Sequence, residues 1–246
     1  MILTVLSGSD NYNLSINNEK GYKKFLLPSL NDLVSGRDFL KNYVTDSEDS
    51  SYHDVRKLIH ELKAKKLNYL EVLFSEEVQF NSSLTAFEGS VLLKLFEYRE
   101  TIVHSNLERL YTAMMNEYFQ QKSFIYRSTS RNETFISEYG YDVRSAFQAQ
   151  KLLFILERYA NSNFSNFKNA IWFETEDEHY QLLMKIRQGQ VSSKEIGREL
   201  DRYKQRIDRK YAQLYKTFPK NDELLDELTT DIEQLIIHNL KKELAD

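Results

Sequence analysis

The segment Gly8-Ser9-Asp10-Asn11-Tyr12-Asn13-Leu14, together with Glu19-Lys20-Gly21-Tyr22-Lys23-Lys24-Phe25-Leu26-Leu27-Pro28, decides the fold of the N-terminal part of this chain. The apolar run at residues 2–6 predicts a short buried strand that ends at the Gly-Ser pair. Residues 22–27 predict a second strand that ends at Pro28. A Gly-Ser pair after a strand lets the backbone approach a phosphate and offers it amides and a hydroxyl. Taken alone, such a pair is typical of an ordinary turn.

Helical spacing of apolar residues dominates the remainder of the chain. Ser29 and Asp54 are expected to cap two helices, the second of which runs to about residue 66. Further helices are predicted from about residue 84 onward, at 107–118, 149–160, 193–215 and 224–236. Residues 69–74 fit either a strand or a helical turn, and the polar residues 128–140 predict a loop.

This layout predicts an α+β fold. Residues 1–80 are expected to form a small α/β unit with a mixed sheet, and residues 81–246 a mostly helical region packed on it. The sequence has no repeat, no low-complexity tract and no flexible linker, so we expect the two regions to pack as one body.

The composition excludes several classes of protein. No cysteine occurs among the 246 residues, which rules out disulfides and thiolate metal sites. The net charge of −4 excludes an overall basic surface for nucleic acid but not a local basic patch. No apolar run approaches the roughly 18 residues of a membrane span, and residues 1–6 lack the basic region of a signal peptide. We therefore expect a soluble, cytoplasmic protein with no membrane association.

The two quoted segments resemble the DNA polymerase β-like nucleotidyltransferases, in particular a bacterial and phage group related to a predicted RNA-repair nucleotidyltransferase. That family has a Gly-Ser-x-x-Tyr-Gly-Leu segment, then Ser-Asp-x-Asp-Tyr-Lys and an apolar strand that ends in proline. The matching positions here are Gly8, Ser9, Tyr12, Leu14, Tyr22, Lys23 and Pro28. The resemblance continues through residues 28–33, 54–58 and 68–74 and implies that residues 1–80 form a nucleotidyltransferase-like unit.

The family's metal-binding carboxylates are only partly present. Its two aspartates fall on Glu19 and Gly21, and a glycine has no side chain to bind a metal. The third carboxylate is expected from a strand near residues 48–52, where Glu48 and Asp49 are the acidic candidates. Metal-assisted phosphoryl transfer needs several close acidic oxygens, because Mg²⁺ prefers oxygen ligands. The resemblance therefore implies a depleted metal site.

A weaker match covers residues 140–153, where the family has a helix that faces the nucleotide. Arg144 stands in place of a lysine, Ser145 and Gln148 in place of two histidines, and Lys151 keeps a positive charge where an arginine is expected. By this resemblance, a nucleotide or phosphate would be held by Gly8, Ser9, Arg144 and Lys151.

The hypothesis that follows is a catalytically degenerate nucleotidyltransferase, with no cofactor, that acts by binding a nucleotide, a phosphate or a protein partner. Because relatives of this compact type are common on phages and mobile elements, the resemblance also implies a role in phage–host conflict. The alternative is an active, magnesium-dependent nucleotidyltransferase that uses Glu19 with Glu48 or Asp49. A third class is a structural protein without a ligand.

Two further surfaces are candidates for nucleic acid. Arg198, Arg202, Arg206 and Arg209 lie mostly along one side of a predicted helix, where they could contact phosphates, unless the acidic residues of the next helix neutralise them. The aromatic and basic residues 124–127 could stack on bases, although they also fit the end of a helix. No two histidines have the helical i, i+4 spacing of a zinc site, and His53 could line the cleft or lie partly buried where a helix begins.

Overall fold

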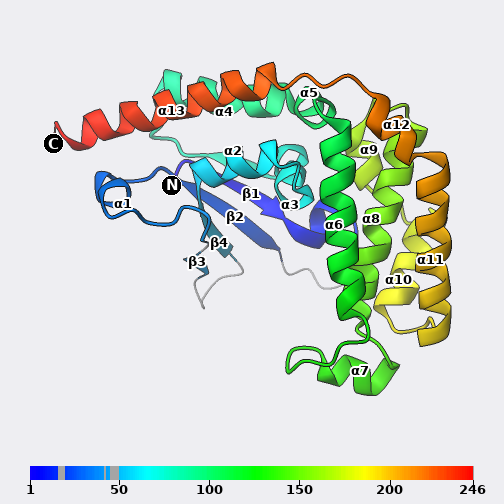
Figure 1. The fold of residues 1–246 in the computed structure, drawn as a ribbon. Helices are drawn as coiled ribbons and strands as arrows, with labels where there is room; N and C mark the ends of the chain where they lie inside the picture. The colour runs from blue at the N-terminus through cyan, green and yellow to red at the C-terminus, as the bar shows by residue number, and fades with distance from the viewer. Residues whose placement is uncertain (16–19, 42, 45–49, 246) are drawn as a thin grey trace. The chain divides into compact units, whose positions relative to one another are not determined.

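The computed structural model of the chain describes residues 1–15, 20–41, 43–44 and 50–245. It has the expected α+β fold, with a small mixed sheet at the N-terminus followed by a mostly helical C-terminal half (Figure 1). The chain divides into two compact units. Unit 1 comprises Met1–Ser105 and Lys220–Asp246, and unit 2 comprises Asn106–Pro219. Unit 1 thus extends beyond the predicted residues 1–80, because two more helices and the last helix of the chain belong to it.

The sheet of unit 1 has five strands in the order β3-β4-β2-β1-β5. Their bounds are β1 Leu3–Ser7, β2 Gly21–Leu26, β3 Tyr43–Val44, β4 Ser50–Asp54 and β5 Val78–Phe80. β1 pairs antiparallel with β2 and β5, and β3 pairs antiparallel with β4. β2 and β4 are parallel, with Tyr22 opposite Ser50, so these two strands begin at the same edge of the sheet.

Eight helical segments connect and cover the strands of unit 1 in the described part of the chain. They are η1 Gly8–Tyr12, α1 Leu30–Val34, α2 Val55–Lys63, α3 Leu67–Leu70, η2 Glu71–Phe74, α4 Ala86–Glu97, α5 Arg99–His104 and α13 Glu223–Glu243. α2 contacts β4 and η2 contacts β1, while α13 packs on α2 and α4 (Figure 1). The apolar residues of α2 recur at helical spacing and therefore share one side of the helix. This side is buried between the sheet and α13.

Unit 2 is a helical bundle around α8. Its helices are α6 Leu107–Phe124, α7 Glu133–Tyr139, α8 Val143–Asn161, α9 Phe167–Ile171, α10 Glu178–Arg187, α11 Ser193–Lys210 and α12 Ala212–Thr217. α6, α9, α10 and α11 each pack against α8, which is therefore buried on nearly all sides. Among the residues that the structure describes, no helix is long and apolar enough to cross a membrane.

Most of the predicted elements are present. Ser29 caps α1 together with Asp32, and the Asp54 side chain accepts a hydrogen bond from the Arg56 amide at the start of α2. Residues 69–74 prove to be helical rather than extended, in α3 and η2. The helix predicted at 193–215 is interrupted at Tyr211, which separates α11 from α12.

The predicted loop at residues 128–140 is wrong for its second half, which forms α7. Phe135, Ile136 and Tyr139 share one side of α7 and are half-buried, but so short a stripe in a polar segment did not indicate a helix. Gly140 ends α7 in the left-handed conformation, with φ of +76°. The ring of Tyr139, the last residue of α7, lies against Gly189, which follows α10.

Replacement of Gly189 by alanine is predicted to destabilise unit 2 more than the same change at Gly140. Both glycines have positive φ, so each alanine variant loses about 1–2 kcal/mol of stability from backbone strain. A Cβ at Gly189 would lie 2.2 Å from the Tyr139 ring, whereas at Gly140 its closest neighbour would be Ser193 at 3.6 Å. Urea unfolding followed by the fluorescence of Trp172, the only tryptophan, measures the difference. Equal losses in the two variants would contradict the role of the Tyr139 contact.

Candidate functional site

The Gly-Ser turn directly follows β1, as the sequence indicates. Gly8 adopts a φ of +83°, which only glycine adopts readily, and begins the short helix η1. Ser7 lies opposite Gly21 in the antiparallel pair of β1 and β2, so the turn lies beside the start of β2. The two matched segments are therefore brought together at one end of the sheet.

A carboxylate of the protein itself occupies this turn. The amide of Gly8 donates a hydrogen bond to Oε1 of Glu71 at 3.3 Å, and the Tyr12 hydroxyl donates to Oε2. Lys23 of β2 donates from Nζ to the same Oε1 at 3.1 Å. Glu71, at the start of η2, is only 3% exposed. The backbone amide that was expected to meet a phosphate thus binds the anion of a glutamate.

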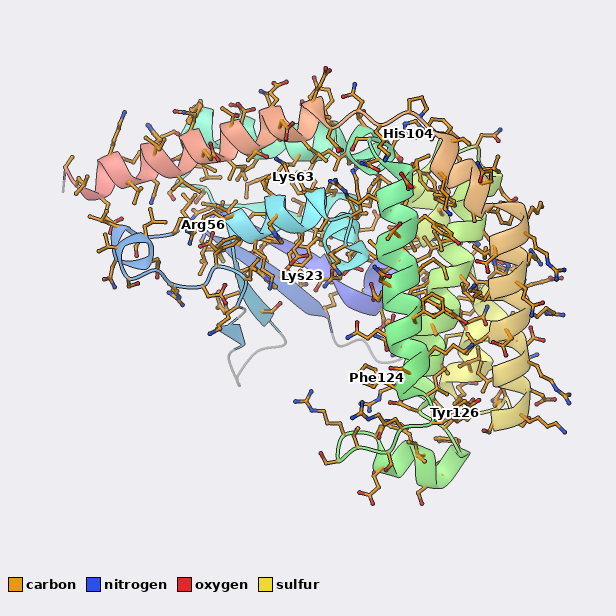
Figure 2. The ribbon with its side chains drawn as sticks, in the orientation of Figure 1. Lys23, Arg56, Lys63, His104, Phe124 and Tyr126 are labelled. Carbon is orange, nitrogen blue, oxygen red and sulfur yellow. The ribbon has the colours of Figure 1, made fainter. Side chains whose placement is uncertain are left out.

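Lys23 completes this buried arrangement. Its ammonium also donates to the Asn68 carbonyl oxygen at 2.8 Å, and its side chain lies between β2 and the helices that cover the sheet (Figure 2). Both partners of the ion pair are almost fully removed from water. Because a buried charge is stable only with a close counter-charge, Lys23 and Glu71 hold each other in place.

The predicted metal ligands precede β2 and β4 in the sequence. Gly21 begins β2, and the parallel register of β2 with β4 places the starts of these two strands at one edge of the sheet. Glu19, Glu48 and Asp49 lie outside the described residues. Within the part of the chain that the structure describes, no three histidine, aspartate or glutamate side chains are grouped as a metal site would require.

The other two predicted phosphate ligands belong to unit 2. Arg144 lies in the first turn of α8, where its guanidinium donates to the Arg131 carbonyl oxygen at 2.7 Å and packs 4.5 Å from the centre of the Phe135 ring. Its side chain remains 53% exposed. Lys151 lies two turns further along α8 and is buried. Gly8 and Ser9 belong to unit 1. The four predicted phosphate ligands are therefore divided between the two units.

His53 is fully buried in β4, rather than partly buried where a helix begins. Its Nε2 lies 2.8 Å from the Ser51 hydroxyl, and its Nδ1 lies 2.9 Å from the Tyr69 hydroxyl. Burial, reinforced by the positive charges of Lys23 and Lys57, lowers the pKa of His53 to about 4. Burial likewise raises the pKa of the Tyr69 hydroxyl. His53 also lines a small cavity of about 50 Å³ at the ends of β2 and β4, whereas the Gly-Ser turn lies beside the start of β2.

The predicted arginine stripe on α11 is partly neutralised within unit 2. Arg206 forms an ion pair with the buried Glu157 of α8, and Arg202 pairs with Glu199 at 2.6 Å. Arg198 interacts electrostatically with Glu195, and in the described part of the chain Arg209 forms no ion pair.

The acidic residues of α13 have partners other than the arginine stripe. Asp226 pairs with Lys63 of α2 at 2.8 Å, and Asp231 pairs with Lys94 of α4 at 2.7 Å. Lys63 points from α2 toward α13 (Figure 2). The acidic face of α13 thus neutralises helices of its own unit, because α13 packs on α2 and α4.

The sequence did not indicate the role of Glu71. This residue is 63 positions from Gly8 and 48 from Lys23, and it belongs to a matched segment for which no chemistry was expected. The only signal was an acidic residue in an otherwise apolar run at residues 69–74. A scan against protein-family models, a search of curated proteins and a search of solved structures each gave no significant match to the chain.

Replacement of Glu71 by glutamine is predicted to destabilise unit 1 by about 3–5 kcal/mol, because it leaves the buried Lys23 without a counter-charge. Urea unfolding followed by circular dichroism measures the loss. The matched control is Glu77→Gln, which removes a carboxylate from the exposed pair with Lys20 and should change stability little. A second replacement, Lys23→Met, should recover part of the loss in the Glu71 variant. A Glu71 variant as stable as the Glu77 variant would contradict the buried pair.

The lowered pKa of His53 predicts that acid destabilises the folded chain. The folded-state value of about 4 lies below the ordinary value of 6.5, so between these two pH values the unfolded chain binds a proton that the folded chain does not. The contribution of His53 to stability is therefore complete above about pH 6.5 and is lost as the pH falls toward about 4.

The stability of His53→Gln should fall less over this range than that of the unaltered chain. The matched control is His60→Gln, which changes an exposed histidine of the adjacent α2. An NMR titration of the His53 ring gives its pKa directly, and a midpoint near the ordinary value would refute the assignment.

Proposed function

We propose that this chain is a non-catalytic binding protein on a scaffold that resembles the nucleotidyltransferases. The observation that carries this proposal is the carboxylate of Glu71, which accepts hydrogen bonds from Gly8, Tyr12 and Lys23. A triphosphate that approached the Gly-Ser turn would meet a negative charge where it requires donors. It would also have to break a buried ion pair, which costs several kcal/mol.

The depleted acidic positions support the same proposal. Gly21 contributes no carboxylate at the start of β2, where the resemblance requires one. A metal-assisted transfer would then depend on Glu19 with Glu48 or Asp49. Since the chain has no cysteine to protect from oxidation or to cross-link, its composition fits the reducing cytoplasm, where we propose that it acts.

The competing function is an active, magnesium-dependent nucleotidyltransferase. One observation favours it: β2 and β4 begin at the same edge of the sheet, so acidic residues that precede the two strands would share one location. In that case the hydrogen bonds of Glu71 with Gly8 and Lys23 would only fix the conformation of the turn. Glu19 with Glu48 or Asp49 would hold the metal.

Transfer and binding assays on the unaltered chain separate the two functions. Each of the four nucleoside triphosphates is added with Mg²⁺ or Mn²⁺, and label transfer to RNA, DNA and protein is measured beside the thermal midpoint. The proposal expects no transfer and no thermal stabilisation by any nucleotide, because the turn already holds an anion. Metal-dependent transfer that disappears in Glu19→Ala would establish the enzyme instead.

The Glu71→Ala variant supplies a positive control for the filled turn. Removal of the carboxylate leaves the Gly8 amide, the Tyr12 hydroxyl and the Lys23 ammonium around an empty anion position. Inorganic phosphate should therefore raise the thermal midpoint of this variant more than that of the unaltered chain. An equal response of the two proteins would show that Glu71 does not occupy the anion position.

A further inference from the structure

The connection between α6 and α7 in unit 2 displays arginines on a fixed backbone. Residues 127–131 follow α6 and are exposed, and they include Arg127 and Arg131. We call these residues, together with Arg144 of α8, the arginine loop. Figure 2 shows Phe124 and Tyr126 at the end of α6, beside α7, where this loop begins.

Asn132 fixes the loop from the inside. Its side chain, in a residue only 3% exposed, accepts hydrogen bonds from the amide of Thr129 at 2.7 Å and from its hydroxyl at 2.9 Å. It donates to the Arg127 carbonyl oxygen at 3.0 Å and to the buried carboxylate of Asp142 at 3.1 Å. Both the oxygen and the nitrogen of this side-chain amide are thus used to hold the loop. Such preorganisation lowers the entropy that a binding site loses when its ligand binds.

Arg144 joins the loop from the start of α8. Its guanidinium donates to the Arg131 carbonyl oxygen and stacks over Phe135, while its side chain remains half exposed. The Arg144 amide also donates to the Asp142 carboxylate at 3.0 Å, and the guanidinium Nε forms a longer ion pair with the same carboxylate at 3.5 Å. One buried aspartate, Asp142, therefore positions both Asn132 of the loop and the third arginine.

Tyr126 adds an aromatic ring next to these charges. Its side chain is 54% exposed, yet its hydroxyl is fixed because it donates to the Ser193 carbonyl oxygen at 3.0 Å, at the start of α11. The ring precedes Arg127 in sequence, so a stacking surface and a cationic group are adjacent. Such a combination is typical of sites for single-stranded nucleic acid, where bases stack on aromatic rings and cations hold the backbone.

The local charge balance is positive although the whole chain is acidic. In the described ranges, Arg127 and Arg131 form no ion pair with a carboxylate, and neither does Lys194 on α11, which begins beside Tyr126. Arg198, one turn further along α11, interacts electrostatically with Glu195. Two carboxylates of this region have neighbours of their own: Glu195 caps α11 through Ser192, and Glu138 lies beside the Tyr139 hydroxyl, whose pKa it raises. Glu133, in the first turn of α7, is the remaining exposed acid of that helix.

We infer that the arginine loop and Tyr126 bind single-stranded nucleic acid. The arginine forks match phosphate oxygens in pairs, and Tyr126 stacks on one base. An acidic peptide would satisfy the arginines but would leave the aromatic ring unused. A duplex would offer phosphates but no exposed base face for Tyr126. The site lies wholly within unit 2, so the inference does not depend on whether the Gly-Ser turn of unit 1 is catalytic.

Fluorescence anisotropy with labelled strands of about 16 nucleotides, a length that covers one typical site, tests this binding. The full chain is titrated with single-stranded RNA, single-stranded DNA and a duplex at increasing potassium chloride. We expect both single strands to bind more tightly than the duplex and binding to weaken steadily with salt. A preference between RNA and DNA identifies the natural strand. No binding to either strand at low salt would overturn the inference.

Charge-reversed variants locate the site. Arg127→Glu with Arg131→Glu should weaken binding by at least roughly tenfold. The slope of the logarithm of the binding constant against the logarithm of the salt concentration should fall by the amount that about two phosphate contacts contribute. The matched control, Lys210→Glu with Lys216→Glu, changes the net charge equally at exposed positions at the other end of α11 and on α12, and should leave binding nearly unchanged. An equal loss of affinity in the two variants would mean that only the overall charge matters, and would overturn the assignment of the site to the arginine loop.

Variants of Tyr126 separate stacking from charge. Tyr126→Ala should weaken binding by about tenfold, whereas Tyr126→Phe, which keeps the ring, should retain most of it. Thermal melting of each variant, and of Asn132→Ala as a variant that loosens the loop, shows whether the fold is intact. Displacement of the strand by an equal concentration of polyglutamate, or the same affinity in the Tyr126→Ala variant, would overturn the nucleic-acid assignment.

Discussion

The ammonium of Lys23 and the carboxylate of Glu71 are withdrawn from water together, between β2 and η2. Neither charge tolerates burial without the other, so the pair fixes η2 against the sheet. The same carboxylate reaches the Gly8 amide and the Tyr12 hydroxyl, and it thereby determines the conformation of the turn after β1. One buried interaction thus connects the sheet, the Gly-Ser turn and the helical layer of unit 1.

The local parts of this fold could be predicted from the sequence because their causes are local. The short apolar run that ends at Gly-Ser predicted β1, and the capping residue Asp54 predicted where α2 begins. α7 was not predicted, because its apolar side is short and lies within a polar segment, and because its last ring, Tyr139, packs against the distant Gly189. The break at Tyr211 was missed for a related reason: helical spacing continues through it, and the interruption is not signalled by glycine or proline.

The candidate site was less predictable than the fold, because its decisive contacts join distant positions. The resemblance implied that the Gly-Ser turn and the start of the second strand share one site, and the antiparallel pairing of β1 with β2 brings them together. It could not indicate that Glu71 would fill the turn, since a glutamate in an apolar run is compatible with either a buried pair or an exposed turn of helix. The sequence left His53 as either a cleft residue or a partly buried residue at a helix start. Ser51 lies two residues earlier on the same strand, but the contact with the Tyr69 hydroxyl of α3 depends on packing.

The two units use a buried carboxylate in opposite ways. Glu71 satisfies the donors of the turn in unit 1 and leaves that turn occupied. Asp142 in unit 2 satisfies the Asn132 amide and the start of α8, and so keeps the backbone of the arginine loop in place while the guanidinium groups of Arg127 and Arg131 face solvent. Since a charge held at the surface on a rigid backbone loses little entropy on binding, the capacity to bind an anionic partner lies with the arginine loop and not with the turn.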